Sequence, residues 1–220
     1  MSELNRRGFL AGAAAGVATI GSTRLQAQSK KAGANERVRV GVVGAGGRAL
    51  SLNRSFAENA NAEIVTIADL DPRRLPRAVE EVYRRQGTKP KTTNDFRHLI
   101  DDNSLDAIVV GTPDHWHAIP SIMAMIAGKD VYVEKPDSHN IVEGMRMVAA
   151  LKKHKRVCQM GSQHRSTKRM QTALEYIKTG ALGRCLVAKA WESSRQGAIG
   201  FPKDGVAPAG VNYDMWCGAA

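Results

Sequence analysis

The sequence predicts an α/β fold in which a doubly wound parallel sheet carries helices on both of its faces. Short runs of β-branched and apolar residues alternate with stretches of helical length, which is the pattern of strands joined by crossover helices. The first run leads into the glycine-rich turn Gly44-Ala45-Gly46-Gly47 at the start of a helix. The chain has 220 residues, of which 43% are hydrophobic and 24% are charged. This composition allows a buried core and excludes disordered, collagen-like and disulfide-scaffold proteins.

The predicted strands and helices follow one another along the chain. The strands are apolar runs suited to a sheet that is buried on both faces: Val38–Val43, Ala62–Ala68, Ala107–Val110, Val131–Val133 and Val157–Met160. The helices are the longer stretches between them: Leu50–Asn59, Pro72–Arg85, Asp95–Ile100, His117–Ala127 and Ile141–Lys153. In the last helix Ile141, Met145, Val148 and Leu151 repeat at helical spacing, so we expect this apolar stripe to lie on the sheet.

The pattern changes after Gly161. A predicted helix over Thr167–Thr179 and a predicted strand over Leu186–Trp191 are followed by a tail rich in glycine and proline. We therefore expect residues 37–160 to form the parallel-sheet domain. Residues 161–220 are expected to be the incomplete start of a second domain of the α+β, open-sheet type.

The N-terminal residues form a predicted targeting signal. Arg6 and Arg7 lie in a twin-arginine pattern, and the apolar run over residues 11–20 is too short to span a bilayer. We predict a twin-arginine signal peptide over residues 1–27, a polar linker over 28–36, and export of the folded protein to the periplasm. The alternative interpretation is a frayed N-terminal helix or a membrane anchor.

Charge and cysteine content narrow the classes of partner. The net charge of +11 favours anionic ligands or surfaces, but the basic residues are scattered over predicted helix faces. Because no nucleic-acid motif occurs and only 5% of residues are aromatic, we do not expect nucleic acid as a partner. The three cysteines lack the spacing of a zinc site, so no metal is predicted. No run after the signal is long enough for a stable membrane span.

The glycine-rich turn has the G-x-G-x-x-A spacing of a dinucleotide-binding site. Gly44 permits the tight turn, and Gly46 leaves room where a pyrophosphate approaches the backbone. Ala49 allows close packing of helix and strand, while Gly47 and Arg48 begin the helix whose amide groups face the phosphates. The turn thus favours a Rossmann-type dinucleotide site, and the alternative is a glycine turn with only a structural role.

The end of the second predicted strand indicates which dinucleotide is bound. Asp69 stands where a carboxylate binds the ribose hydroxyls of the adenosine half. It would repel a 2′-phosphate, so the sequence favours NAD over NADP. Arg73 and Arg74 could partly offset that repulsion, which leaves NADP open.

Two further motifs follow strands that end at the same edge of the sheet. Thr112-Pro113-Asp114-His115-Trp116-His117 comes after one strand, and Glu134-Lys135-Pro136 comes after the next. A lysine there can hold a substrate hydroxyl and transfer its proton, so Lys135 is the candidate catalytic residue. The alternatives are helix capping or surface imidazoles for His115 and His117, and a turn with a surface ion pair for the second motif.

These motifs, in this order, resemble the Gfo/Idh/MocA oxidoreductases, the family of glucose-fructose oxidoreductase and inositol dehydrogenase. The resemblance covers about residues 37–220 and implies that the second domain binds substrate. It implies that one group of residues contacts the cofactor, with Lys135 also catalytic: Gly44, Gly46, Gly47, Arg48, Ala49, Asp69, Thr112, Pro113, Asp114, His117, Glu134, Lys135 and Gln163. His115 and Arg165 are implied near the substrate. Asp114 departs from the family, where Asn is common.

The resemblance further implies an exported branch of the family and a longer chain. Relatives continue well beyond the segment 212–218, so we expect a C-terminally truncated protein that lacks most of its second domain. A homo-oligomer is left open for the full-length form.

The predicted function is that of an NAD(P)-dependent oxidoreductase that transfers hydride to or from a secondary hydroxyl of a sugar or cyclitol. One alternative is a cofactor-binding module without turnover. Another is an NAD-dependent glycosidase of the same superfamily that acts through a transient ketone. By resemblance that branch replaces the lysine of the second motif, so Lys135 speaks against it.

Overall fold

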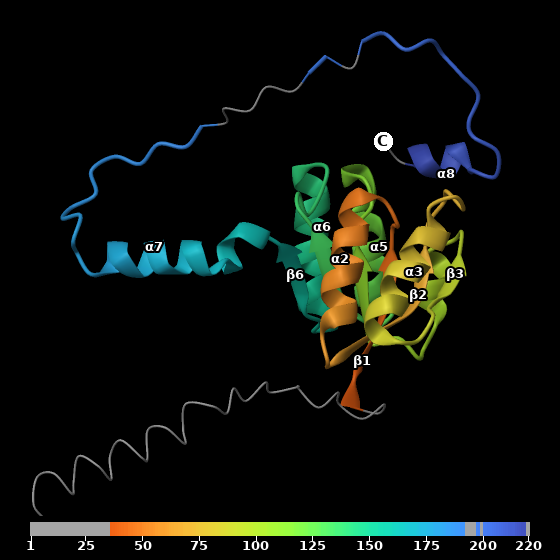
Figure 1. Ribbon diagram of the computed structural model, residues 1–220, viewed down its shortest axis with the longest axis horizontal. Coiled ribbons are helices and arrows are strands. Elements are labelled where there is room, and N and C mark those ends of the chain that lie inside the picture. The colour runs from red at the N-terminus through yellow and green to blue at the C-terminus, as the bar shows by residue number, and fades with distance from the viewer. Residues whose placement is uncertain (1–35, 192–196, 199, 219–220) are drawn as a thin grey trace, which may run out of the picture.

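Figure 1 shows the computed structural model of the chain, which describes residues 36–191, 197–198 and 200–218. The predicted signal peptide, and all but the last residue of the predicted linker, lie outside the described residues. The strands are β1 (Val38–Val43), β2 (Ala62–Ala68), β3 (Lys91–Thr93), β4 (Ala107–Val110), β5 (Asp130–Glu134) and β6 (Cys158–Gly161). The α-helices are α2 (Gly47–Glu58), α3 (Leu75–Gln86), α4 (Arg97–Asp101), α5 (Ala118–Ile126), α6 (Ile141–His154), α7 (Lys168–Lys178) and α8 (Tyr213–Cys217). The short 3₁₀ helices are η2 (Asp114–Trp116) and η3 (Gln163–Ser166).

The strands form one parallel sheet in the order β3-β2-β1-β4-β5-β6. The strand order therefore reverses between β1 and β4. Val43 at the end of β1 pairs with Ala68 of β2 on one side and with Val110 of β4 on the other. The carboxyl ends of these three strands are level at the switch point, which is where open α/β sheets bind ligands. This confirms the predicted doubly wound Rossmann sheet.

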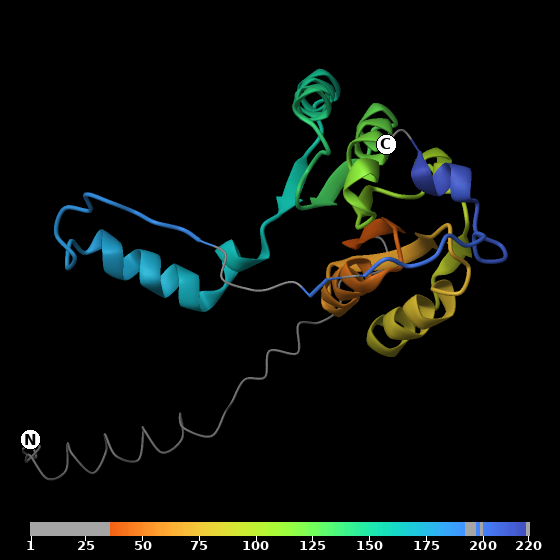
Figure 2. The ribbon, with the colours of Figure 1, turned by 90° about the horizontal axis from the view of Figure 1, so that it is seen from above.

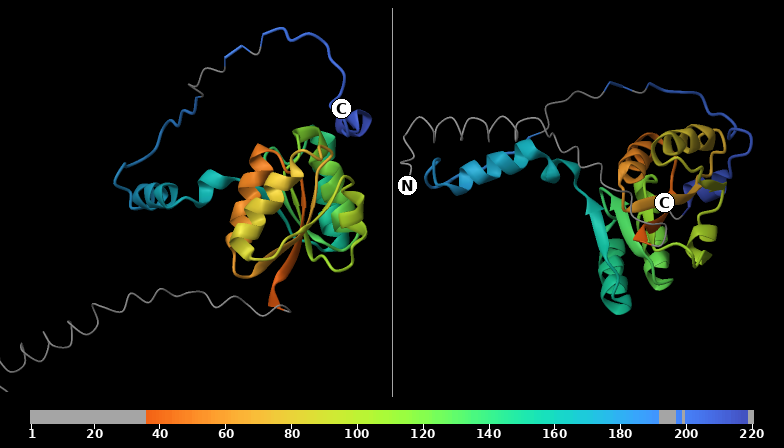
Figure 3. Two further views of the ribbon diagram at one scale, coloured as in Figure 1. Left: turned by 45° about the vertical axis from the view of Figure 1, so that its right-hand side comes forward. Right: turned by 60° about the horizontal axis from the view of Figure 1, so that its bottom comes forward.

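Helices cover both faces of the sheet, as predicted. Figure 3 shows α2 and α3 on one face and α4, α5 and α6 on the other. Strand side chains alternate between two cores: Ile108 and Val110 of β4 belong to one core, and Val109 belongs to the other. All three are fully buried. Burial on both faces explains why the sequence shows a continuous apolar run there.

Strand β3 was not predicted from the sequence. This strand consists of Lys91, Thr92 and Thr93 and pairs with β2 at the edge of the sheet. None of the three is buried, so the strand shows no apolar run. An edge strand of this kind is held by backbone hydrogen bonds, which the sequence pattern does not report.

The expected stripe on α6 is wrong. Ile141, Met145 and Val148 are exposed, whereas Met147 and Ala150 lie in the core and Leu151 packs against it. Apolar residues occur on several sides of this helix, so their spacing alone does not select one face. The side that packs carries Met147 and Ala150, and α6 makes its contacts with α5.

The predicted strand over Leu186–Trp191 is also wrong. This segment has no regular secondary structure, and Leu186, Val187 and Trp191 are exposed. A strand requires a neighbour for its backbone groups, and none of the described strands lies beside this one. Helix α7, which precedes it, is exposed along its whole length and extends away from the sheet (Figure 2).

None of the helices in the described part of the chain has the length and apolar character needed to cross a membrane.

Candidate functional site

The glycine-rich turn between β1 and α2 brings the backbone very close to the end of β4. Gly44 has a φ of 108°, a left-handed conformation that favours glycine. A Cβ atom on Gly44 would lie 2.8 Å from the carbonyl oxygen of Gly111. A Cβ atom on Gly111 would in turn lie 3.0 Å from the Cβ of Ala49. The geometry gives Gly44 and Ala49 the packing roles that their spacing predicts.

The start of α2 is open toward the cleft. Gly46 is the N-cap residue and adds no capping side chain, and the first turn contains no acidic residue. A Cβ atom on Gly47 would meet nothing within 4 Å. The first amide groups of a helix lack partners within the helix and carry partial positive charge. This end of α2 can therefore bind a phosphate group.

Asp69 is fixed beside the turn, directly after β2. Its carboxylate accepts hydrogen bonds from the backbone amides of Ala45, at 2.6 Å, and Asp71, at 2.8 Å. A carboxylate offers about four acceptor positions, so two of them are left for a ligand. The side chain is half-buried and lines the cleft, where it can accept hydrogen bonds from the hydroxyl groups of a ribose.

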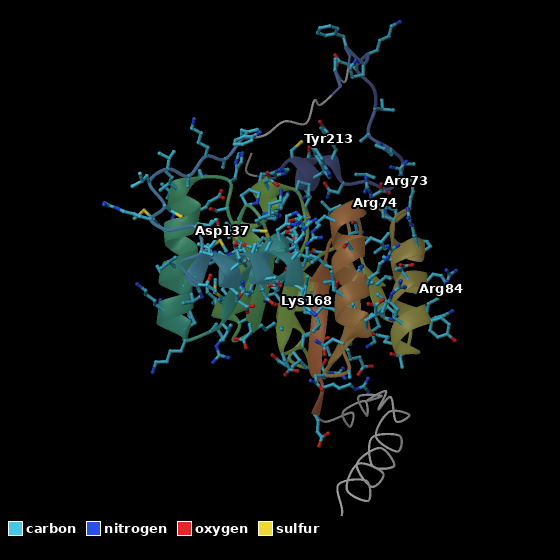
Figure 4. All side chains as sticks on the ribbon, turned by 60° about the vertical axis from the view of Figure 1, so that its left-hand side comes forward. Arg73, Arg74, Arg84, Asp137, Lys168 and Tyr213 are labelled. Atoms are coloured by element: carbon cyan, nitrogen blue, oxygen red, sulfur yellow. The ribbon has the colours of Figure 1, made fainter. Side chains whose placement is uncertain are left out.

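Asp71 forms ion pairs with Arg73 and Arg74, the two arginines that could offset the repulsion between Asp69 and a 2′-phosphate. Arg73 donates to it through Nε and Nη2, each at 2.8 Å, and the Nε of Arg74 lies 3.4 Å away. The hydrogen bond from Arg73 holds the pKa of Asp71 well below its usual range. Figure 4 shows Arg73 and Arg74 on the same side of the molecule as Tyr213. Because both guanidinium groups already share a carboxylate, their attraction for a further phosphate is weakened.

The loop after β4 forms the facing wall of the cleft. Thr112 and Pro113 line it, while Asp114 is exposed at the start of η2 and does not. The hydroxyl oxygen of Thr112 is buried and has no hydrogen-bond partner. Buried polar atoms are nearly always satisfied, so this atom is suited to a ligand that supplies the missing partner.

His117 lies behind this wall. Its side chain is buried, and its two ring nitrogens face the carbonyl oxygens of Thr112, at 2.9 Å, and Pro136. The ring therefore links the loop after β4 to the loop after β5. The structure places His117 outside the cleft lining, so it can act on a cofactor through the position of these two loops.

The end of β5 is joined to the glycine turn by an ion pair. Glu134 is only 2% exposed and binds Arg48, whose Nε and Nη2 lie 2.7 and 2.6 Å from its Oε1. Arg48 comes from the first turn of α2 and lines the cleft. Lys135 is exposed directly after Glu134, and its peptide bond to Pro136 is cis. Lys135 therefore lies at the carboxyl edge of the sheet, but neither Glu134 nor Lys135 is among the residues that line the cleft.

Gln163 and Arg165 lie elsewhere. They belong to η3 and line a second hollow of about 390 Å³, together with Tyr132 and Ser162. Neither residue is among those that line the main cleft. Their predicted contacts with cofactor or substrate stay predictions.

Sequence analysis missed the apolar part of the main cleft. The cleft has a volume of about 510 Å³, and its apolar lining includes Leu70, Phe96, Trp116, Val211 and Met215. Two of these residues come from the C-terminal segment, which reaches the sheet only in the folded chain. His115 contacts that same segment. Across the described residues, no cluster of three or more His, Cys, Asp or Glu side chains could hold a metal ion.

The residues present fit a dinucleotide. The open end of α2 suits a pyrophosphate, the carboxylate of Asp69 suits a ribose, and the hydroxyl of Thr112 offers a further buried hydrogen bond. The apolar lining around Phe96 suits a flat ring.

Residues 38–162 match the Gfo/Idh/MocA oxidoreductase family, which has an NAD-binding Rossmann fold. The chain belongs to this family. The match spans the whole sheet and all three motifs, of which the glycine turn and the loop after β4 line the cleft. It ends before η3, so it includes neither α7 nor α8.

Known proteins resemble parts of the chain. The glycosyl hydrolase family 109 protein 1 of Shewanella sp. strain ANA-3 is 29% identical over 159 residues, which are 70% of this chain and 35% of that protein. The WlbA dehydrogenase of Bordetella pertussis, solved with NADH and UDP-GlcNAcA, is 26% identical with a TM-score of 0.58 over 68% of this chain and 43% of its own. The myo-inositol 2-dehydrogenase of Lactobacillus plantarum, at 24% identity and a TM-score of 0.60 over 67% of this chain and 43% of its own, has the same fold. The chain spans less than half the length of these proteins.

The ion pair between Arg48 and Glu134 should stabilise the site measurably. We expect a double-mutant cycle with Arg48→Met and Glu134→Gln to give a coupling free energy of about 1–3 kcal/mol, because Glu134 is buried while Arg48 is partly exposed. Urea unfolding of the four proteins measures it. The exposed pair of Arg84 and Glu80 is the control and should give about 0.5 kcal/mol or less. Equal coupling in the two cycles would show that burial adds nothing to the pair.

Proposed function

We propose that this protein is an NAD-dependent oxidoreductase that transfers a hydride to or from a secondary hydroxyl of a sugar or cyclitol. One observation carries the proposal: the open end of α2, Asp69 and Thr112, whose buried hydroxyl has no hydrogen-bond partner, all line one cleft. Membership of an oxidoreductase family with an NAD-binding fold supports it. The dehydrogenase that was solved with NADH and a nucleotide sugar supports the substrate class.

Different residues at this edge of the sheet would bind the cofactor and transfer the proton. When bound, NAD supplies the site that accepts or returns the hydride. Asp69 and the first amides of α2 would hold it, and Thr112 would accept or donate a hydrogen bond on the β4 side. The ammonium group of Lys135 would hold the substrate hydroxyl and move its proton, because an exposed lysine after β5 is accessible to a substrate.

Neighbouring residues position Lys135. Glu134 accepts a hydrogen bond from the backbone amide of Lys135 at 3.1 Å and is itself held by Arg48. The carbonyl of Pro136 faces the ring of His117. The loop that carries the lysine is therefore tied to both α2 and β4, which favours a fixed position for its side chain.

Replacing Lys135 separates an enzyme from a binding module. In the longest form of the protein that the gene encodes, Lys135→Met should lower turnover roughly 100- to 10,000-fold, the usual contribution of general acid–base catalysis. NAD affinity should change far less, because the glycine turn and Asp69 provide most of the binding. Calorimetric titration with NAD and hydride-transfer assays over sugars and cyclitols measure the two effects.

Lys155→Met is the control, because Lys155 is an exposed lysine outside the cleft at the end of α6. An active wild type with undiminished turnover in Lys135→Met would remove Lys135 from the catalytic residues. No turnover on any substrate, together with normal NAD binding, would favour the binding module.

Cofactor preference should depend on Asp69. Asp69→Ser should weaken NAD binding and relieve the repulsion of a 2′-phosphate, a switch of about 1–3 kcal/mol. Asp71→Ser is the matched change: it leaves Asp69 in place but frees Arg73 and Arg74, so NADP binding should improve while NAD binding is kept. Titration of each variant with both dinucleotides tests this. Unchanged NAD and NADP affinities in Asp69→Ser would show that Asp69 does not contact the ribose.

A second candidate is an NAD-dependent glycosidase, favoured by the glycosyl hydrolase family 109 name of a relative. Lys135 speaks against it. The two functions differ in their products. A dehydrogenase forms NADH in proportion to the sugar consumed, whereas a glycosidase releases the aglycone of an aryl glycoside with no net NADH. Both can be followed in one absorbance assay.

We further propose export through the twin-arginine pathway, based on Arg6 and Arg7 alone. Replacing both with Lys should leave the protein in the cytoplasm in folded form, because the export receptor reads the paired arginines. Cell fractionation of wild type and variant tests this. Export that continues unchanged in the variant would refute the assignment.

A further inference from the structure

The C-terminal segment crosses the mouth of the cleft. Pro208, Val211 and Met215 line the cleft together with Leu70 and Phe96, which lie near the ends of β2 and β3. We call residues 208–216 the lid segment. It lies outside the part of the chain that matches the family, so neither the fold nor that match assigns it a role.

Specific contacts hold the lid segment in place. The carbonyl oxygen of Trp216 is 3.1 Å from the indole nitrogen of Trp116, which donates to it, and 2.9 Å from Nε2 of His115. The rings of Trp216 and His115 lie edge to face at 5.7 Å. At its other end, Gly210 approaches Pro72 so closely that a Cβ atom would lie 3.2 Å from that ring. The lid segment therefore bridges the loop after β2 and the loop after β4.

The lid segment covers the half of the cleft next to Asp69, where the base of the adenosine half would bind. In a doubly wound sheet the carboxylate after β2 binds the ribose of the adenosine half, so the base lies beyond it, toward β3. The residues there are Leu70, Asn94 and Phe96, and all three line the cleft. Val211 and Met215 face the same cleft from the lid segment. The arrangement is a slot with apolar groups on both sides, which suits a flat purine ring.

We propose that the lid segment closes a pocket for the adenine base and thereby helps to hold the dinucleotide. This inference rests on the proposed NAD-binding function. With the lid segment in place the cleft still has a volume of about 510 Å³, so the segment covers the cleft without filling it. Met215 also packs against the core of the sheet domain, which keeps the lid segment close to the base site.

Two glycines provide a matched test. Gly218 follows α8 at a φ of 60°, and a Cβ atom there would lie 2.5 Å from the ring of Trp116. Gly218→Val should therefore push the lid segment off Trp116, and it substitutes none of the cleft-lining residues, of which Trp116 is one. Gly205 lies in the same C-terminal stretch, and a Cβ atom there would meet nothing within 4 Å. Gly205→Val is the control.

The experiment is a calorimetric titration of wild type and both variants with NAD⁺ and with ADP-ribose, which lacks the nicotinamide. We expect Gly218→Val to weaken both ligands by the same factor, roughly tenfold. Gly205→Val should bind both like wild type. Thermal melts without ligand should be similar for the three proteins, because the sheet domain is unchanged.

A second pair of variants tests the lining itself. Val211→Ala should weaken both ligands, whereas Val206→Ala, at a fully exposed valine of the same stretch, should not. If Gly218→Val or Val211→Ala weakens NAD⁺ but not ADP-ribose, the lid contacts the nicotinamide half and the adenine assignment is wrong. Tighter binding in these variants would show that the lid blocks the cleft, and unchanged binding would show that it touches no ligand. A wild type that binds neither ligand overturns the proposed function, and this inference with it.

Discussion

The close approach of two glycines, Gly44 after β1 and Gly111 after β4, is the constraint on which the rest of the site depends. Side chains at either position would force the strand ends apart, since their Cβ atoms would overlap the opposite backbone or Ala49. The contact sets α2 against the end of β4, at the point where the strand order reverses. The open helix end, Asp69 and Thr112 therefore face one another across a single cleft.

Charge pairing around this contact determines which groups remain for a ligand. Arg48 is paired with Glu134, and Arg73 and Arg74 share Asp71, so the three arginines that line the cleft are all partly neutralised by carboxylates. Positive potential toward a phosphate then comes mainly from the amides of α2. Asp69 accepts hydrogen bonds from the backbone amides of Ala45 and Asp71 and lines the cleft. This balance agrees with a dinucleotide that has no 2′-phosphate.

The sequence predicted features that depend on local pattern and missed those that depend on distant contacts. Five of the six strands of the sheet, the glycine turn and the place of Asp69 after β2 were predicted because burial on both faces and close packing each leave a pattern in neighbouring residues. The packed face of α6 was not predicted, because its residues Met147 and Ala150 are no more apolar than the exposed Ile141. The contact between Trp116 and Trp216 could not be predicted either, because tertiary folding alone brings the residues together. The isolated strand expected over Leu186–Trp191 failed for lack of a neighbour.

The measurement that tests this account most directly is NAD⁺ titration of Gly46→Ala beside Gly205→Ala. A Cβ atom on Gly46 would meet only the end of the flexible Arg74 side chain, and one on Gly205, which does not line the cleft, would meet nothing, so both variants should fold like wild type. If the pyrophosphate lies against Gly46, Gly46→Ala should weaken NAD⁺ binding by more than about tenfold while Gly205→Ala binds normally. Normal NAD⁺ binding by a folded Gly46→Ala variant would contradict the proposed site.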